Sequence, residues 1–409
     1  MLIPSRILSR LILMTGLLIA PLAPLSSPAQ TVPQIVQNIN ISFNGADAER
    51  QISYQQSFWS ASDAYLQHLP GSTRARGARY CHTYVSFDVA DDATGSSAEG
   101  GLKWLVDWLR TENGHCDEAL ITFKWNEAIS NNRSNSTRGN SEPPKPEQFK
   151  VEMQHFLSKA AGWKASGLFK GNIAYTAWNE PNNPAKSGSG FGGQAIPAKL
   201  AADYYLELRT VCGNDCTVAA GDFGSNGQMW HDFVQRCDND EASNLCSNAS
   251  YLDTYKHAID ADSATIGPAP NHRPEVWAYH AWDDVNNFVN GKNRCTTPTN
   301  YDTCTTQAFV HALQGTWGKS IIWDTEVGSG QPGITSPPDA VQAQGAAFLL
   351  VLTAIQGPRI QRIYYTKAFY PSADRGNQWG SLFYPNGNPR PAYCVLTKRQ
   401  IMYPSGACK

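Results

Sequence analysis

Segments typical of β-strands alternate along this chain with segments typical of helices, and the alternation repeats eight times. The strand-like segments are rich in β-branched and aromatic residues and end at turn-forming residues. They are 35–43, 78–87, 119–125, 173–178, 217–220, 275–282, 320–325 and 360–365. The helix-like segments are 60–69, 102–109, 146–161, 197–211, 251–259, 306–317, 340–355 and 391–399. Strict alternation of this kind predicts a parallel sheet with helices packed outside it.

Eight strand–helix units close most naturally into a (β/α)8 barrel, whose active site lies at the carboxyl ends of the strands. The chain of 409 residues is long enough for such a barrel, and no change in composition marks a linker. We therefore predict an α/β fold, a TIM barrel, as a single domain over residues 30–409. The alternative is an open doubly wound sheet, which would bind its ligand where the strand order reverses.

The first 29 residues have the features of a signal peptide. Arg6 and Arg10 form a basic start, 11–20 is a short apolar core, and 27–29 supplies the small residues that precede a cleavage site. The apolar core is too short to span a membrane. We therefore predict removal of residues 1–29 and export of the rest, to the periplasm or the cell exterior, without a membrane anchor.

Ten cysteines fit a protein of an oxidising compartment. Their number is even and their spacings are short, which favours pairing between neighbours, although the sequence alone leaves the connectivity open. The pairs favoured by spacing are Cys81–Cys116, Cys212–Cys216, Cys237–Cys246, Cys295–Cys304 and Cys394–Cys408. Cys212 and Cys216 also have the spacing of zinc ligands, but no second pair of Cys or His answers them, so we expect no metal site.

Neither charge nor motifs indicate a cofactor or a nucleic-acid partner. The formal net charge is −2 and like charges do not gather in runs. The glycine-rich segment 188–193 matches a dinucleotide-binding pattern only formally, because no strand precedes it and no helix opens on it. Gly-x-Ser-x-Gly and His-Glu-x-x-His motifs are absent from the sequence, which argues against serine esterases and zinc proteases. We expect no cofactor.

Two glutamates follow strand-like segments where each strand should reach the barrel mouth. Glu180 precedes Pro181, which ends the fourth strand because proline cannot donate to the sheet. Glu326 ends the seventh strand, and in a barrel these two strand ends face each other across the mouth. Either residue alone could be an ordinary surface glutamate. As a pair about 5–5.5 Å apart, one carboxylate can attack a sugar while the other protonates the leaving oxygen.

The two segments that hold these glutamates are similar to motifs of the clan A retaining glycoside hydrolases. The segments are Trp178-Asn179-Glu180-Pro181-Asn182 and Trp323-Asp324-Thr325-Glu326-Val327-Gly328, and 380–393 also resembles the end of many such barrels. The resemblance implies a (β/α)8 barrel in which Glu180 is the acid/base and Glu326 the nucleophile. It further implies that Asn179 binds the 2-hydroxyl of the sugar under attack. It names a clan and a mechanism, but no individual family.

Further residues near strand ends are candidates for sugar binding. The resemblance leads us to expect a His or Tyr after the sixth strand and an aromatic platform after the eighth, while aromatic faces beside amides and carboxylates suit sugars in general. The substrate-binding candidates are Asp88, Trp125, Asn126, Asn179, Tyr279, His280, Trp282 and Trp379. Asp324 would share a strand face with Glu326 by the period of two, so we expect it to have a cationic partner.

The sequence thus predicts a secreted, monomeric glycosidase that cleaves O-glycosidic bonds in a polysaccharide or oligosaccharide by double displacement. Long loops at 126–146, 181–196 and 237–246 favour a polysaccharide. One alternative is a catalytically silent carbohydrate-binding or cell-wall-associated barrel, which widely separated carboxylates would support. Another is a transglycosylase that uses the same two glutamates. The sugar, the linkage and the choice between endo and exo action stay open.

Overall fold

The computed structural model describes residues 39–41, 48–68, 78–125, 143–183, 195–225, 250–263, 273–292, 295, 304–328, 339–356, 359–365, 381–384 and 386–398. The chain divides into residues 1–32 and residues 33–409, and all described residues belong to the second unit. The predicted signal peptide and the candidates Asn126 and Trp379 lie outside the described residues.

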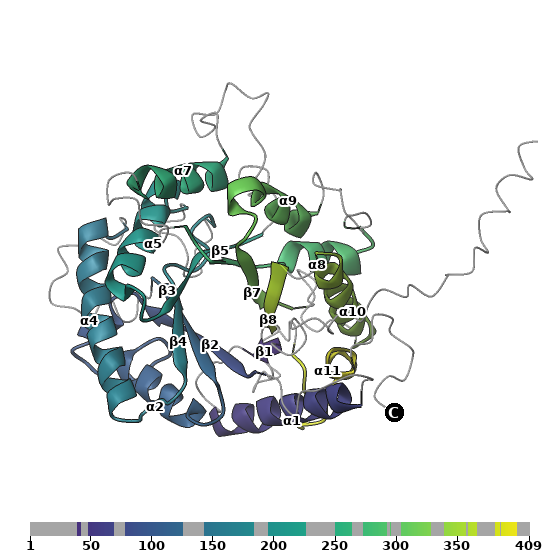
Figure 1. Cartoon of the computed structure of the whole chain (residues 1–409). Helices are drawn as coiled ribbons and strands as arrows, with labels where there is room; N and C mark the ends of the chain where they lie inside the picture. The colour runs from purple at the N-terminus through teal and green to yellow at the C-terminus, as the bar shows by residue number, and fades with distance from the viewer. Residues whose placement is uncertain are drawn as a thin grey trace, which may run out of the picture. The chain divides into compact units, whose positions relative to one another are not determined.

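Seven strands form a parallel sheet that curls around, with helices covering its outer side (Figure 1). They are β2 (Tyr80–Ser86), β3 (Glu118–Lys124), β4 (Asn172–Thr176), β5 (Thr217–Phe223), β6 (Val276–Tyr279), β7 (Ile321–Val327) and β8 (Ile360–Tyr365). Neighbours in the chain are neighbours in the sheet from β2 to β8. The three-residue strand β1 (Ile39–Ile41) pairs in parallel with β8. The order of these strands never reverses, so the doubly wound alternative is wrong and the sheet is TIM-like.

Helices follow the strands as the alternation predicts. They are α1 (Ala48–Gln67), η3 (Val89–Asp91), α2 (Leu102–Glu112), α4 (Pro146–Ala165), α5 (Ala198–Cys212), α7 (Tyr251–Ser263), α8 (Trp282–Val289), α9 (Thr305–Ala312), η4 (Gly315–Trp317), α10 (Asp339–Ile355) and α11 (Pro391–Thr397). The predicted start of the first helix at Ser60 is wrong. Buried Ile52, Phe58, Trp59 and Leu66 recur at helical spacing, so the buried stripe already begins upstream of Ser60.

The sixth strand is shorter than predicted. It ends at Tyr279, and Trp282 is instead the first residue of α8. The two residues between them, His280 and Ala281, turn the chain from the sheet into the helix. This difference matters because His280 is placed at the strand tip, where its side chain can reach residues from neighbouring strands.

Apolar side chains pack on both sides of the curled sheet. The larger core lies between the strands and the helices and includes Phe123, Phe149, Trp277 and Phe309. A separate cluster comes from alternate positions of the same strands. It consists of Leu120, Ala174, Ala219, Val276, Ala278, Trp323 and Tyr364. The period of two along a strand separates these two sets, as expected for a sheet buried on both faces.

Near the amino ends of the strands, Arg362 of β8 joins several strands through one guanidinium group. It forms an ion pair with Glu118 of β3, and its guanidinium carbon lies 3.7 Å from the ring centroid of Tyr80 and 3.8 Å from that of Trp323. One guanidinium nitrogen donates to the Tyr364 hydroxyl at 3.3 Å. Arginine suits this position because its planar group can stack on rings while it pairs with a carboxylate.

Three of the predicted disulfides are present. Cys81–Cys116 ties β2 to the segment between α2 and β3, Cys212–Cys216 spans the turn from α5 to β5, and Cys295–Cys304 precedes α9. Cys394 is also disulfide-bonded, while Cys237, Cys246 and Cys408 lie outside the described residues. In the described part of the chain, no helix combines the length and the apolarity needed to cross a membrane.

We expect Arg362→Met to lower the free energy of unfolding by about 3 kcal/mol, because Glu118 would keep a largely buried charge without its partner. Guanidinium denaturation with the disulfides intact measures this loss. The control is Lys103→Met, which breaks a surface pair with Asp107 whose side chains are 60% and 45% exposed. That variant should change the free energy by no more than about 1 kcal/mol. Equal losses in both variants would contradict a structural role for Arg362.

Candidate active site

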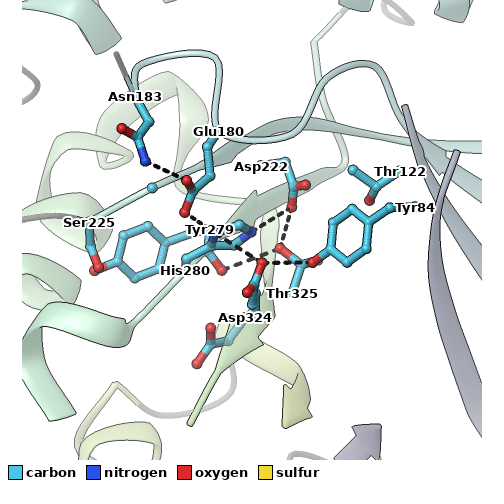
Figure 2. A network of polar contacts seen from close by, with 12 residues as sticks. Tyr84, Thr122, Glu180, Asn183, Asp222, Ser225, Tyr279, His280, Asp324 and Thr325 are labelled. Carbon is cyan, nitrogen blue, oxygen red and sulfur yellow. Dashed lines mark hydrogen bonds and ion pairs between the residues drawn. The ribbon is translucent and has the colours of Figure 1, made fainter. Parts of the chain in front are cut away.

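Polar side chains from five strand ends meet near the carboxyl ends of the sheet (Figure 2). They are Tyr84, Glu180, Asn183, Asp222, His280, Thr325 and Glu326, and hydrogen bonds or ion pairs join them. We call this set the polar cluster. Both predicted catalytic glutamates belong to it, as does one predicted substrate-binding residue, His280.

Glu180 is held by contacts at both carboxylate oxygens. Asn183 donates to Oε2 at 2.6 Å, and Oε1 lies 2.8 Å from Nδ1 of His280. The backbone N–H of Glu180 donates to the carbonyl of Asp222 at 2.8 Å. Its φ of 42° is in the left-handed region, which costs a non-glycine residue about 1–3 kcal/mol. Such strain persists where the surroundings hold a residue in one conformation. The Glu180 side chain remains 15% exposed to solvent.

Asn182 fixes the segment that carries Glu180 to the end of β5. Its side-chain amide donates to the carbonyl of Gly224 at 2.8 Å and accepts from the N–H of Gly224 at 2.9 Å. Gly224 also needs to lack a side chain, because a Cβ there would lie 2.9 Å from the Glu180 carboxyl carbon. The neighbouring Trp178 is fully buried and packs 5.3 Å from Tyr204, between ring centroids. The segment 178–182 therefore orients Glu180 through several independent contacts.

Irregularities in two strands turn side chains toward the cluster. The pairing of β5 with β6 shifts between Gly221 and Phe223, and the residue between them, Asp222, has a φ of 71°. The pairing of β7 with β8 shifts between Asp324 and Val327, a segment that contains Glu326. Bulges of this kind re-aim side chains and are common beside active sites.

Glu326 is 24% exposed and has two polar neighbours in the cluster. The hydroxyl of Tyr84 donates to its Oε2 at 2.8 Å, and Nδ1 of His280 lies 3.8 Å from the same oxygen. Burial, and then the charge of Glu180, raise the pKa of the Glu326 carboxyl above its usual value, while His280 and Tyr84 act in the opposite direction. Burial raises the pKa of Tyr84 well above its usual value, so its hydroxyl stays a donor.

His280 is fully buried between two carboxylates. Its Nε2 lies 3.3 Å from Oδ1 of Asp222, opposite the contact of Nδ1 with Glu180. Burial by itself lowers the pKa of His280, but Asp222 and the two glutamates outweigh burial and raise it well above the usual value. Burial by itself raises the pKa of the Asp222 carboxyl, but His280 outweighs burial, so that the pKa of Asp222 is lowered overall. Each of the two groups therefore favours the charged form of the other.

A row of buried polar groups continues from Asp222 across the sheet. Thr325 donates to Asp222, Thr176 donates to Thr122 at 2.7 Å, and Nε2 of His82 lies 2.9 Å from the Thr122 hydroxyl. Burial lowers the pKa of His82 to about 4, so this second histidine is neutral at pH 7. Among the described residues His82 and His280 are the buried histidines, and their pKa values are shifted in opposite directions.

The other sequence candidates lie near the same strand ends but outside the polar cluster. Asp88 is buried and accepts a hydrogen bond from Ser86. Trp125 is half-buried and stacks 5.9 Å from Phe87, between ring centroids. Trp282 is half-buried at the start of α8. Asn179 is 9% exposed, and its side-chain oxygen is buried without a hydrogen-bond partner.

Tyr279 and Asp324 point to other neighbours. The Tyr279 ring stacks on Phe309 with centroids 4.8 Å apart, and its hydroxyl lies 2.7 Å from that of Thr305, so this side chain packs against α9. Asp324 accepts from the backbone N–H of Ala281 at 3.1 Å, in place of the cationic partner that the sequence suggested. Burial raises the pKa of Asp324 well above its usual value. The shifted pairing of β7 explains why the period of two fails here.

Sequence reasoning missed Tyr84, Asn183, Asp222 and Thr325 as members of the cluster. Two signals were present. Tyr80, His82 and Tyr84 alternate on one face of the second strand, and Gly221-Asp222-Phe223 places an acid beside a glycine at a strand end. Neither signal says which residues of other strands the side chains would meet.

Potential metal ligands among the described residues lie elsewhere. Three groups have suitable spacing, and two of them contain cysteines that are disulfide-bonded. The third consists of Asp91, Glu152 and His155, in which Asp91 and His155 already form an ion pair at 3.0 Å. None of the three groups includes Glu180 or Glu326.

A cavity of about 350 Å³ opens at the other end of the sheet. Its lining includes Glu118, Arg209, Arg273 and Glu275, near the amino ends of β3 to β6. Barrel enzymes perform their chemistry at the carboxyl ends of the strands, and this lining mixes both signs of charge. The polar cluster is therefore the better candidate for an active site.

Comparisons with known proteins find similarity in fold. No protein-family model and no curated protein matches the chain. A glucosidase from Croceicoccus marinus superposes with a TM-score of 0.52 at 9% identity, over 91% of this chain and 66% of that one. The GH39 enzyme from Xanthomonas axonopodis pv. citri gives 0.50 at 13% identity, over 88% and 65%. A family 39 glycoside hydrolase from Bacteroides cellulosilyticus WH2 gives 0.49 at 14% identity, over 90% and 64%.

This chain spans just under two thirds of the length of these three structures. At such low identity the likeness concerns the fold alone. That fold is shared with solved glycoside hydrolases, which is consistent with the clan A resemblance, and no individual family is assigned.

We expect the stability of the protein to depend on His82 at acid pH. Its pKa is about 4 when folded and about 6.5 when unfolded. Between these values the unfolded chain binds the proton more tightly, so the free energy of unfolding falls as the pH falls. When the pH is lowered from about 8 to about 5, the free energy of unfolding of His82→Gln should fall by about 2 kcal/mol less than that of the wild type.

Urea denaturation at the two pH values measures this difference. If the free energy of unfolding of His82→Gln depended on pH as it does in the wild type, His82 would not be held neutral in the folded protein.

Proposed function

We propose that the chain is an exported, retaining glycoside hydrolase that cleaves O-glycosidic bonds in a polysaccharide or oligosaccharide. One observation carries the proposal. Glu180 and Glu326, from the ends of β4 and β7, both contact Nδ1 of His280, at 2.8 and 3.8 Å. Two carboxylates that share one nitrogen as neighbour are close together, and both keep some exposure to solvent.

Close spacing favours retention over inversion. Retaining glycosidases hold their carboxyl groups about 5–5.5 Å apart, so that one can attack the sugar directly. Inverting enzymes need about 6.5–9.5 Å, because a water molecule must fit between the base and the sugar. The shared contact with His280 supports the shorter spacing.

The mechanism assigns one role to each glutamate. Glu326 attacks the anomeric carbon, and protonated Glu180 gives its proton to the departing oxygen. Glu180, now ionised, then takes a proton from the water molecule that releases the sugar. Tyr84 and Asn183 keep the two carboxylates in place through the hydrogen bonds described above.

The sugar-binding roles stay with residues near the same strand ends. Asn179 has a buried side-chain oxygen without a partner, which a sugar hydroxyl could satisfy. Trp125 and Trp282 offer half-buried rings, and Asp88 a carboxylate. We retain Asn126 and Trp379 as proposals from the sequence. Tyr279 we assign to packing, because its ring and hydroxyl contact α9.

The chain architecture is part of the proposal. We propose that residues 1–29 are a signal peptide and that 30–409 form a closed, monomeric (β/α)8 barrel as one domain. The disulfides support export to an oxidising compartment, and the parallel pairing of β1 with β8 supports closure. The solved glycoside hydrolases that share the fold support the barrel. The proximity of the two carboxylates counts against a catalytically silent barrel.

Wild-type protein should release sugar from one member of a panel of plant, fungal and bacterial cell-wall polysaccharides. Glu180→Ala should lower the rate about 10²–10⁴-fold, the usual contribution of a general acid, and Glu326→Ala should lower it at least as far. The control is Glu207→Ala, whose side chain is also 24% exposed but pairs with Lys150 on the helices. NMR of the first product formed should show the anomeric configuration of the substrate.

Activity that survives in Glu326→Ala would remove Glu326 from the nucleophile role, and an inverted product would replace retention by inversion. Binding of a polysaccharide without release of sugar would favour the silent barrel.

Gly224→Ala tests whether the position of the Glu180 carboxyl matters, because this variant keeps Glu180 but should move its side chain. A Cβ at this site would displace the Glu180 carboxyl from His280 and Asn183, and displacements of about 1 Å can cost about 10²-fold in rate. We expect a loss of this order on the same polysaccharide, with the midpoint of thermal unfolding close to that of the wild type. The control is Gly162→Ala in α4, where nothing lies within 4 Å of the added carbon. Full activity of Gly224→Ala would contradict the role of this close approach.

A further inference from the structure

The proton that Glu180 would deliver has a defined position in the polar cluster. Oε2 of Glu180 accepts a hydrogen bond from the Asn183 amide, so it cannot easily carry the proton itself. The other oxygen, Oε1, lies 2.8 Å from Nδ1 of His280. Either the imidazolium donates to an ionised carboxyl, or a protonated carboxyl donates to a neutral imidazole. In both cases one proton lies between these two atoms.

Asp222 supports the imidazole from the other side. Its Oδ1 lies 3.3 Å from Nε2, so Nε2 keeps a proton whether or not Nδ1 has one. Asp222 is fully buried and reaches this position through a bulge with a left-handed backbone. A buried carboxylate is costly without compensation, and here the compensation comes from His280 and from the Thr325 hydroxyl. This contact keeps a proton on Nε2, so the neutral form of His280 has an unprotonated Nδ1, and it is Nδ1 that faces Glu180.

Among the residues of the polar cluster His280 is the one basic side chain, and the ammonium nitrogen of Lys124 lies 5.4 Å from the ring centroid of Tyr84. On the side of β2, His82 is neutral at pH 7 because burial lowers its pKa to about 4. On the side of β7, burial raises the pKa of Asp324 well above its usual value, and Glu326 lies 3.8 Å from Nδ1. The carboxylates of Asp222, Glu180 and Glu326 therefore surround one imidazolium.

We propose that Asp222 and His280 store the proton that Glu180 delivers to the leaving oxygen. The proton moves from Nδ1 of His280 to Oε1 of Glu180, and the new hydroxyl turns toward the glycosidic oxygen and protonates it. His280 is then neutral with its remaining proton on Nε2, and it regains a proton when Glu180 has taken one from water. This proposal rests on the proposed function, because it uses the acid role of Glu180. Asp222 and His280 are positioning residues in this scheme.

The transfer also acts on the nucleophile. While His280 is charged, it stabilises the Glu326 carboxylate from 3.8 Å. Once the proton is on Glu180, that positive charge is gone, and Glu326 is a better nucleophile at the moment when the acid is ready. One proton thus prepares both glutamates.

NMR of the full chain with ¹⁵N-labelled histidine tests, without a substrate, whether His280 holds the proton. His280→Gln identifies the signals of His280 among the nine histidines. In the wild type both ring nitrogens should be protonated at neutral pH. In Asp222→Asn the titration midpoint should fall by about 1–3 units, since a neighbouring opposite charge shifts a midpoint by that amount. Glu180→Gln should lower it too, and it serves if Asp222→Asn fails to fold.

A neutral His280 in the wild type at pH 6–7 would overturn the proposal. So would an unchanged midpoint in Glu180→Gln and in folded Asp222→Asn.

Kinetics on the polysaccharide that the panel identifies give the second readout. The carboxylate of Asp222 favours the stored proton, so its loss in Asp222→Asn should move the alkaline limb of kcat/KM to lower pH by about 1 unit or more. A merely structural role would lower kcat/KM at every pH and leave the limb in place, which would overturn the proposal. Absence of sugar release from any polysaccharide would refute the proposed function instead, and the NMR titration would still decide whether His280 and Glu180 share the proton.

Discussion

One buried imidazolium holds the candidate active site together. His280 touches Glu180 and Asp222 with its two ring nitrogens and lies within ion-pair distance of Glu326. Three carboxylates gathered at strand ends would repel one another in a poorly hydrated environment, and the cation between them is what permits the arrangement. Because its ring is fully buried, its charge is little screened by solvent. The spacing of the two glutamates, and hence the proposed mechanism, depends on this contact.

The backbone supplies the precision that side-chain chemistry requires. A left-handed backbone at Glu180 and Asp222 is energetically unfavourable, and the hydrogen bond from the N–H of Glu180 to the carbonyl of Asp222 links the two residues. The amide of Asn182 fastens the turn after β4 to Gly224 after β5, and the absent side chain of Gly224 leaves room for the Glu180 carboxyl. These contacts join groups from separate strands.

Stability and chemistry are placed at opposite ends of the sheet. Near the amino ends of the strands, Arg362 pairs with Glu118 and stacks on two aromatic rings, so its charge is fully engaged in structure. Near the carboxyl ends, the charges of the polar cluster are only partly compensated, and two of them keep exposure to solvent. This division is the one expected for barrel enzymes.

The sequence by itself determined the parallel arrangement, the approximate bounds of most elements, three disulfides and the two glutamates. These follow from local properties: the period of apolar residues, proline and glycine at strand ends, and short cysteine spacings. Only the tertiary structure decided that Tyr84, Asp222 and Thr325 join the glutamates, that Tyr279 packs against a helix, and that Asp324 meets a backbone N–H. Bulges in β5 and β7 break the period of two on which sequence reasoning relies. The side-chain contacts of Tyr84, Asp222 and Thr325 within the polar cluster join residues 58 to 242 positions apart, so their choice depends on how the curled sheet aligns its strands.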